Sequence, residues 1–251
     1  MDGRVARVNA LTIDDLCVTY GARRVFDGFS LRVARGETVA VLGASGSGKS
    51  TLLRAIAGLV KPQRGAIRSN GEIGYVFQEP RLFPWLDVER NVAFAARGPQ
   101  ERARVTEVLE LVGLGSVHRL LPKELSGGMA QRAALARSLV RHPSLLLLDE
   151  PLAALDALRR LELQGALRRL ISAMGTAAVL VTHDVDEALF LADRVIVLAG
   201  EPATVRLEVV AEPELRTVLL AALGVEAEVS EGRRSGVPRL DRAEPIGCIR
   251  R

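Results

Sequence analysis

The segment from Gly43 to Thr51, GASGSGKST, constrains this chain more than any other. It fits the pattern G-x-x-x-x-G-K-[ST] and lies between ETVAVLG, which has strand character, and KSTLLRAIAGL, whose apolar residues recur at helical spacing. Strand, glycine-rich turn and helix, in that order, are the context in which this pattern binds phosphate. A chance match in a chain of this length is expected about once in a hundred. A phosphate-binding α/β core is therefore predicted.

The residues of this loop have distinct predicted roles. Glycines let the backbone wrap a phosphate with its amides pointing inward, and the helix N-terminus adds a favourable dipole. Lys49 is then placed to reach the β- and γ-phosphates, and the Ser50 hydroxyl to bind Mg²⁺. A purely structural glycine turn does not need Lys and Ser directly after it. The predicted nucleotide contacts are Gly43, Ala44, Ser45, Gly46, Ser47, Gly48, Lys49, Ser50 and Thr51.

Apolar runs of strand length recur along the rest of the chain. SLLLLDE, TAAVLVTH and RVIVLAG alternate with the helical stretches 157–174 and 184–192, which is typical of parallel strands covered on both faces. Short alternating strands begin at residue 11, and helical patterns occupy 80–143. The predicted fold class is α/β with a helical insertion at 80–143. The Gly, Pro and charged residues of 230–251 predict a flexible tail.

The predicted helix 157–174 has an apolar and a basic side. The expected buried face holds Leu158, Leu161, Leu167, Leu170 and Met174. The arginines largely opposite them are Arg159, Arg160, Arg168 and Arg169. Such a pattern is typical of the solvated side of a surface helix, so no function is assigned to these arginines.

Composition narrows the class of partner. With 48% hydrophobic residues among 251, the chain can bury a substantial core. The net charge of +4 comes from arginines dispersed among nearly as many acidic residues, so nucleic acid is not predicted as a partner. No stretch approaches the roughly 18 to 20 apolar residues of a membrane span, and the start lacks the apolar block of a secretory signal. A cytoplasmic location is expected.

Two adjacent carboxylates end the apolar strand LLLLDE. Ligands of parallel sheets bind at the carboxyl edge, where Asp149 and Glu150 are expected to lie. Asp149 is predicted to hold Mg²⁺, and Glu150 to orient or deprotonate an attacking water. An acidic cap on a buried strand is the alternative. It explains one carboxylate better than two followed by Pro151.

Two further features suggest anion contacts. His183 ends the strand AAVLVTH at the same predicted edge, where a neutral imidazole can donate to the γ-phosphate; His118 and His142 are interpreted as structural. In LSGGM, Ser126 is placed to cap the helix GMAQRAALARSLVR, with two glycines leaving amides open. One chain has no obvious second phosphate for that helix, but two paired copies would supply one.

The stretch VFQEPRLFPWLDVERNV, residues 76–92, concentrates large aromatic side chains in a proline-containing segment. Phe77 is expected to close the strand IGYVF as part of the core. Phe83 and the only tryptophan, Trp85, fit either core packing of the insertion or a partner's surface, where aromatic residues are favoured.

Taken in order, these motifs resemble the ATP-binding subunits of ABC transporters. The resemblance covers residues 11 to about 200 and rests on the phosphate loop, Gln78, LSGGMAQR, LLLLDEP, LAALD and His183. It implies one ABC-type P-loop NTPase domain over 1–251, with a mainly parallel nucleotide-binding core (11–79 and 144–210), an N-terminal antiparallel β subdomain and a helical subdomain (80–143). It also implies ATP and Mg²⁺ as ligands and ATP hydrolysis as the activity.

The resemblance implies that two copies pair head to tail, so that LSGGM of one covers ATP held by the other. Ser126, Gly127 and Gly128 would contact the phosphate across the dimer, and Asp156 would lie at the interface. The fifth signature residue is Met129, where Gln is the commonest choice, which puts one polar contact in doubt.

The resemblance also assigns roles around the phosphates. Gln78 would sense Mg²⁺ and the water, and Tyr20 matches the position that stacks on adenine, although edge-strand packing is an alternative. The implied catalytic residues are Lys49, Gln78, Glu150 and His183. The implied metal ligands are Ser50, Gln78 and Asp149.

Without a membrane segment of its own, the chain would act peripherally at the cytoplasmic face of the membrane on separate permease subunits. The expected contact is through Phe83, Pro84 and Trp85, and an extracytoplasmic solute-binding protein would take part indirectly. QEPRLFPW, LSGGM and LDEPLAALDALRR are most similar to the nitrate, sulfonate and taurine importer group. One rival is a soluble ABC ATPase without a permease. A second is a P-loop kinase, which leaves LSGGM and His183 without a role.

Overall fold

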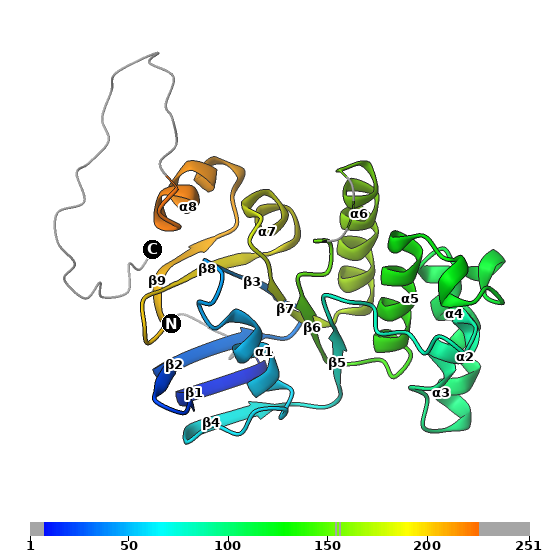
Figure 1. Ribbon diagram of the computed structural model, residues 1–251, viewed down its shortest axis with the longest axis horizontal. Helices are drawn as coiled ribbons and strands as arrows, with labels where there is room; N and C mark the ends of the chain where they lie inside the picture. Colours follow the sequence, from blue (N-terminus) through cyan, green and yellow to red (C-terminus); the bar gives the residue numbers. More distant parts are fainter. Residues whose placement is uncertain (1–7, 154, 156, 226–251) are drawn as a thin grey trace, which may run out of the picture.

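The computed structural model describes residues 8–153, 155 and 157–225. A three-stranded antiparallel sheet, in the order β2-β1-β4, comprises β1 (Asn9–Tyr20), β2 (Arg23–Ala34) and β4 (Arg64–Ser69). A six-stranded sheet, in the order β5-β6-β7-β3-β8-β9, comprises β3 (Thr38–Gly43), β5 (Ile73–Val76), β6 (Leu145–Asp149), β7 (Ala177–Val181), β8 (Arg194–Ala199) and β9 (Thr204–Val210). Only β9 pairs antiparallel in the second sheet. The predicted α/β class is confirmed (Figure 1).

The strand β6 shows why the large sheet needs cover on both faces. Leu146 and Leu148 pack into the cluster formed with α5 (Gly127–Leu139), α6 (Ala157–Met174) and α7 (Val185–Leu191). Leu145 and Leu147 pack into a second cluster, with α1 (Lys49–Ile56) and the antiparallel sheet. Burying each of these leucines contributes about 2 kcal/mol. The unbroken apolar run therefore matches a strand buried on both sides.

The segment between β5 and β6 is helical, as predicted, but one predicted helix is divided in two. The helices are α2 (Val88–Ala93), α3 (Pro99–Ala103), α4 (Val105–Leu111) and α5, with 3₁₀ turns at Gly115–Val117 and Pro122–Glu124. The pattern ERARVTEVLELVGL predicts one helix, but the structure breaks it at Arg104. The α3 segment buries no residue, whereas α4 buries Val105, Val108 and Leu109. Only the second half therefore has an apolar face to pack.

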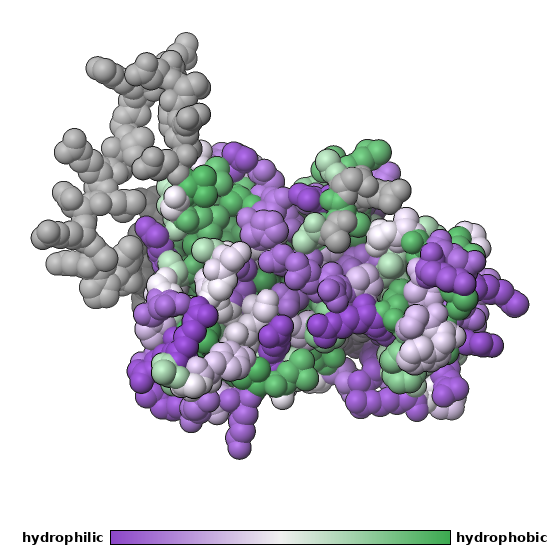
Figure 2. All heavy atoms as spheres, in the orientation of Figure 1, coloured by the Kyte–Doolittle hydropathy of each residue, from purple (hydrophilic) through white to green (hydrophobic). Residues whose placement is uncertain are grey.

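The start of α6 departs from its predicted orientation. Leu158 and Leu161 are 69% and 67% exposed, whereas Leu163, Leu167 and Leu170 are buried. The prediction that the first two leucines face the core is wrong. The first turns of α6 extend beyond the end of the sheet, so no strand lies beneath them, and this end of the helix shows apolar surface in Figure 2.

The C-terminal part of the described chain forms a 3₁₀ turn (Pro213–Leu215) and α8 (Arg216–Ala222) after β9. The predicted tail at 230–251 and the predicted interface residue Asp156 lie outside the described residues. Within 8–153, 155 and 157–225, no helix has both the length and the apolar character needed to cross a membrane.

Candidate active site

Four neighbouring parallel strands bring the predicted catalytic segments to one edge of the large sheet. The phosphate loop follows β3, Gln78 follows β5, Asp149 ends β6 with Glu150 directly after it, and His183 follows β7. Because these strands run parallel, their carboxyl ends meet at the same edge. Residues as distant as Gln78 and His183 are therefore brought to one place.

Glycine is required at two positions of the phosphate loop. A Cβ atom at Gly43 would lie 2.6 Å from Ser47 Oγ and 2.9 Å from the Leu198 carbonyl oxygen. Gly48 has φ 93°, and a Cβ there would lie 2.7 Å from Val25 Cγ1. Gly48 is also the N-cap of α1 and offers no side-chain hydrogen bond. The first amides of α1 therefore stay open to an anion.

Lys49 lies within this loop with its ammonium group buried. Its Nζ donates to the carbonyl oxygens of Gly43 (2.8 Å) and Ala44 (2.9 Å). Burial lowers the pKa of Lys49, while Glu150 and Asp149 act in the opposite direction. Ser47 Oγ is buried and has no hydrogen-bond partner within the described part of the chain. A cation, open amides and an unpaired hydroxyl fit a nucleotide phosphate.

Asp149 is buried between two hydroxyl groups. Ser50 Oγ donates to its Oδ1 at 2.9 Å, and Tyr75 OH donates to its Oδ2 at 3.1 Å. Burial, followed by the charge of Asp149, raises the pKa of Tyr75. The described ranges contain no group of three or more His, Cys, Asp or Glu side chains able to hold a metal. The hydroxyl and carboxylate fit Mg²⁺, which completes its shell with water and substrate phosphates.

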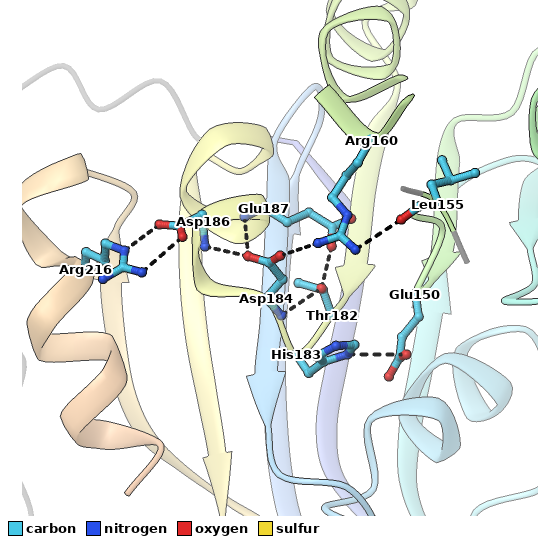
Figure 3. Close-up of polar contacts among 9 residues, drawn as sticks. All are labelled: Glu150, Leu155, Arg160, Thr182, His183, Asp184, Asp186, Glu187 and Arg216. Atoms are coloured by element: carbon cyan, nitrogen blue, oxygen red, sulfur yellow. Dashed lines mark hydrogen bonds and ion pairs between the residues drawn. The ribbon is translucent and has the colours of Figure 1, made fainter. Parts of the chain in front are cut away.

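Glu150 contacts two of the other predicted catalytic side chains, Gln78 and His183, and Figure 3 draws the contact with His183. Its Oε2 accepts a hydrogen bond from Gln78 Nε2 at 3.3 Å and lies 3.4 Å from His183 Nδ1. The backbone of Glu150 has φ 46°, a region that non-glycine residues seldom adopt, and its N–H donates to the Val181 carbonyl oxygen at 2.9 Å. This conformation aims the carboxylate between Gln78 and His183.

The LSGGM segment lies apart from the phosphate loop. Ser126 caps α5, because its Oγ accepts from Met129 N at 3.3 Å, and a concave pocket of about 170 Å³ lies beside Ser126, Gly128 and Met129. The helices α5 and α1 belong to opposite faces of the sheet. No hydrogen bond between described residues joins 126–128 to 43–51. The chain does not bring this segment to its own phosphate loop.

Tyr20 ends β1 and is 48% exposed. Its register partner on β2 is Arg23, whose Nη2 donates to the Gly46 carbonyl oxygen of the phosphate loop at 3.0 Å. The end of β1 that holds Tyr20 is thereby tied to that loop, as a contact with the base would require.

An aromatic cluster, formed by Phe83, Trp85 and Phe94, lies on the surface of the helical segment. The Phe83 ring centroid is 5.6 Å from that of Trp85 and 4.5 Å from that of Phe94. Trp85 is 71% exposed and Phe94 66% exposed. Phe77 lies one residue beyond β5, which ends at Val76. Its ring is half-buried, stacks on Tyr75 and is covered by the Arg81 guanidinium, so it is not part of the core. The prediction of Phe77 as a core residue is therefore wrong.

The fully buried Asn91 holds the backbone beneath the aromatic cluster. Its Oδ1 accepts from Phe83 N at 2.7 Å, and its Nδ2 donates to the carbonyl oxygens of Phe83, Leu86 and Asp87 at 2.8–3.1 Å. A buried amide with these partners fixes the loop conformation. Sequence analysis does not identify three residues that hold the site, because no motif connects them to the segments of their partners. These residues are Arg23, Tyr75 and Asn91.

Comparison with known proteins agrees with this arrangement. A family described as "ABC transporter" matches residues 26–153. The "Aliphatic sulfonates import ATP-binding protein SsuB 1" of Xanthomonas axonopodis pv. citri is 50% identical over 200 residues, which cover 74% of this chain and 79% of that protein. "SsuB 3" of Nocardia farcinica, with the same description, is 49% identical over 226 residues, covering 86% of this chain and 92% of that protein.

Two solved structures share the fold. The structure of cbiO1 from Clostridium perfringens, described as part of the ABC transporter complex cbiONQ, superposes with a TM-score of 0.75 at 29% identity, covering 85% of this chain and 91% of that one. A dimeric post-hydrolysis state of an ATP-binding cassette with ADP and Pi superposes with a TM-score of 0.69 at 30% identity, covering 80% and 99%.

Proposed function

The chain belongs to the ABC transporter family and is an ATPase, and from that premise we propose that it powers an importer whose permease and solute-binding protein are separate chains. The observation that supports this most strongly is the meeting of Gln78, Glu150 and His183 beside the phosphate loop. In this proposal, the core (11–79 and 144–210) holds ATP, and the helical subdomain (80–143) meets the permease.

We assign hydrolysis to side chains already in position. Lys49 and the loop amides hold the phosphates, and Ser50, Asp149 and Gln78 hold Mg²⁺, which neutralises phosphate charge. Glu150 orients and deprotonates the attacking water, while His183 donates to the γ-phosphate. Tyr20 stacks on the adenine.

A second copy completes the site. The pocket beside Ser126 and Gly128 has no phosphate-loop residue of its own chain in its lining, and the glycine at 127 has open space around it. Head-to-tail pairing would let Ser126, Gly127 and Gly128 contact ATP held by the partner. This pairing explains why a helix N-terminus with open amides lies on the surface.

The permease contact is assigned to Phe83, Pro84 and Trp85. Core packing is disfavoured, because Pro84 and Trp85 are exposed while Asn91 holds their backbone rigid from below. A rigid, exposed aromatic surface costs little entropy on binding. The proposed location is the cytoplasmic face of the membrane. A soluble ABC ATPase without a permease has no use for this surface.

The proposed solute is an aliphatic sulfonate, since the relatives named above carry that description. The test is to co-express the chain with the neighbouring permease and binding protein and to measure ATPase activity with alkanesulfonates, taurine, nitrate and pyrimidines. Stimulation by alkanesulfonates above the others is expected. Stimulation by another solute alone would contradict the solute, and failure of the chain to associate with any permease would contradict the transport function.

A further inference from the structure

Arg160, in the first turn of α6, connects the loops that follow β6 and β7 (Figure 3). Its Nη1 donates to Asp184 Oδ2 at 3.0 Å, and its Nη2 donates to the Leu155 carbonyl oxygen at 3.3 Å. The Arg160 side chain is 35% exposed and that of Asp184 27% exposed, so the pair is largely shielded from water. The interpretation of Arg160 as a solvated surface residue is therefore wrong.

Each loop held by Arg160 carries a proposed catalytic residue at or next to its start. Glu150 starts the first loop, which turns back on itself through hydrogen bonds from Ala153 N to the Glu150 carbonyl oxygen and from Leu155 N to that of Leu152. His183 directly precedes Asp184 in the second. One planar guanidinium with two forked donors therefore fixes the spacing of two loops whose side chains meet at 3.4 Å.

Most of the other hydrogen bonds of the β7 loop lie within its own segment, and Thr182 N also donates to the Val41 carbonyl oxygen of β3 at 3.3 Å. Asp184 Oδ1 caps α7 by accepting from Asp186 N and Glu187 N, and Asp184 N donates to Thr182 Oγ1. Thr182 Oγ1 in turn donates to the buried Glu187 at 2.6 Å. These bonds set the shape of the loop, whereas Arg160 adds a side-chain link from the β6 loop to Asp184, beyond the backbone bond from Glu150 N to the Val181 carbonyl oxygen.

We propose that Arg160 is a positioning residue for ATP hydrolysis, which holds Glu150 and His183 at the distance that the reaction needs. This inference rests on the proposed function. Arg160 does not touch the nucleotide in this account. Its loss should slow the chemical step and leave ATP binding intact, because the phosphate loop is built from other segments.

The matched control is Arg216, a second arginine that contacts a carboxylate at the start of α7. Arg216 of α8 contacts Asp186 of α7 through its Nε at 2.7 Å, on the side away from His183 (Figure 3). Both variants remove one arginine that contacts a carboxylate near the start of α7. Only one of them separates the catalytic loops.

The test measures steady-state ATPase activity of Arg160→Ala, Arg216→Ala and wild type. Arg160→Ala should lower kcat about 10-fold or more with KM within about twofold, and Arg216→Ala should leave both unchanged. In a His183→Ala background, Arg160→Ala should lower kcat by a smaller factor than in wild type, because the part of its effect that acts through His183 is already lost.

Three results would overturn the role of Arg160: wild-type kcat in Arg160→Ala, an equal loss in the control, or the same fold-loss in the His183→Ala background. If Arg160→Ala does not fold, kcat of Arg160→Lys is measured instead, since one ammonium group cannot reproduce the forked contact. A wild-type kcat in Arg160→Lys would contradict the proposal. Absence of ATPase activity in the wild-type chain would instead overturn the proposed function.

Discussion

At the carboxyl edge of the large sheet, the proposed functional side chains bond to one another, whereas the rings of the aromatic cluster pack on each other and form no hydrogen bond with the part of the chain that the structure describes. Ser50, Tyr75 and Asp149 satisfy each other, and Gln78 and His183 meet at Glu150. Beneath Trp85, by contrast, one buried residue, Asn91, bonds only to backbone.

The difference matches the two kinds of ligand. A small, highly charged ligand needs side chains aimed inward and held by neighbours before it arrives. A protein partner needs a fixed backbone that presents large side chains to the outside. Gln78 lies between the two regions, five residues before Phe83, so in the proposed function the same short segment would serve both.

Glu150→Gln is the strongest test of the nucleotide edge. It keeps the size of the side chain and removes the base, so ATP hydrolysis should fall by about 10³-fold while ATP binding persists. Turnover by the purified variant, compared with Glu107→Gln on the exposed face of α4, measures this. Near-normal hydrolysis would remove Glu150 from the catalytic role.

Asn91→Ala is the corresponding test of the aromatic cluster. The change leaves the Phe83 N–H and the Leu86 carbonyl oxygen without their partner and removes one of two donors from the carbonyl oxygens of Phe83 and Asp87, so the free energy of unfolding should fall by about 3 kcal/mol. Urea denaturation provides the measurement. Asn70→Ala, which removes one exposed hydrogen bond to the Asn9 carbonyl oxygen, should cost under about 1 kcal/mol. Equal losses would mean that Asn91 does not fix the loop.

The free energy of unfolding should depend on pH through Glu187, which lies at the start of α7 near the nucleotide edge. Burial raises the pKa of Glu187 from 4.5 to about 7. Between these values the folded chain holds a proton that the unfolded chain has released, so the free energy of unfolding rises as pH falls. Relative to Glu187→Gln, wild type should gain about 2 kcal/mol between pH 8 and pH 5. Denaturation of both proteins across this range tests it, and a pH-independent difference would refute the shift.

Sequence analysis anticipates the parts of the site that depend on strand order. The phosphate loop, Asp149, Glu150 and His183 are predictable because each ends an apolar parallel strand, and such strands end at one edge. Tyr75, Asn91 and Arg160 are not, since their partners come from segments that only the tertiary fold brings near.

The spacing of apolar residues predicts burial wrongly where a helix or a loop extends past the end of the sheet. It places Leu158 and Leu161 in the core and Arg160 in solvent, because it takes no account of what lies beside the first turns of α6. The same limit applies to Phe77, one residue beyond the end of β5. Local pattern cannot locate the boundary of the core.

Trp85→Ala tests most directly whether the aromatic cluster binds a partner and the sheet edge carries out ATP hydrolysis independently of it. Its effect on the isolated chain should be the smallest of all, since 71% of the side chain is already exposed, so ATPase activity should stay within about twofold of wild type. Co-purification with the permease should weaken by about 2 kcal/mol, roughly 30-fold, and Leu59→Ala, another exposed apolar residue, should leave it unchanged. Loss of ATPase activity together with unfolding, or undiminished capture of the permease, would contradict the account.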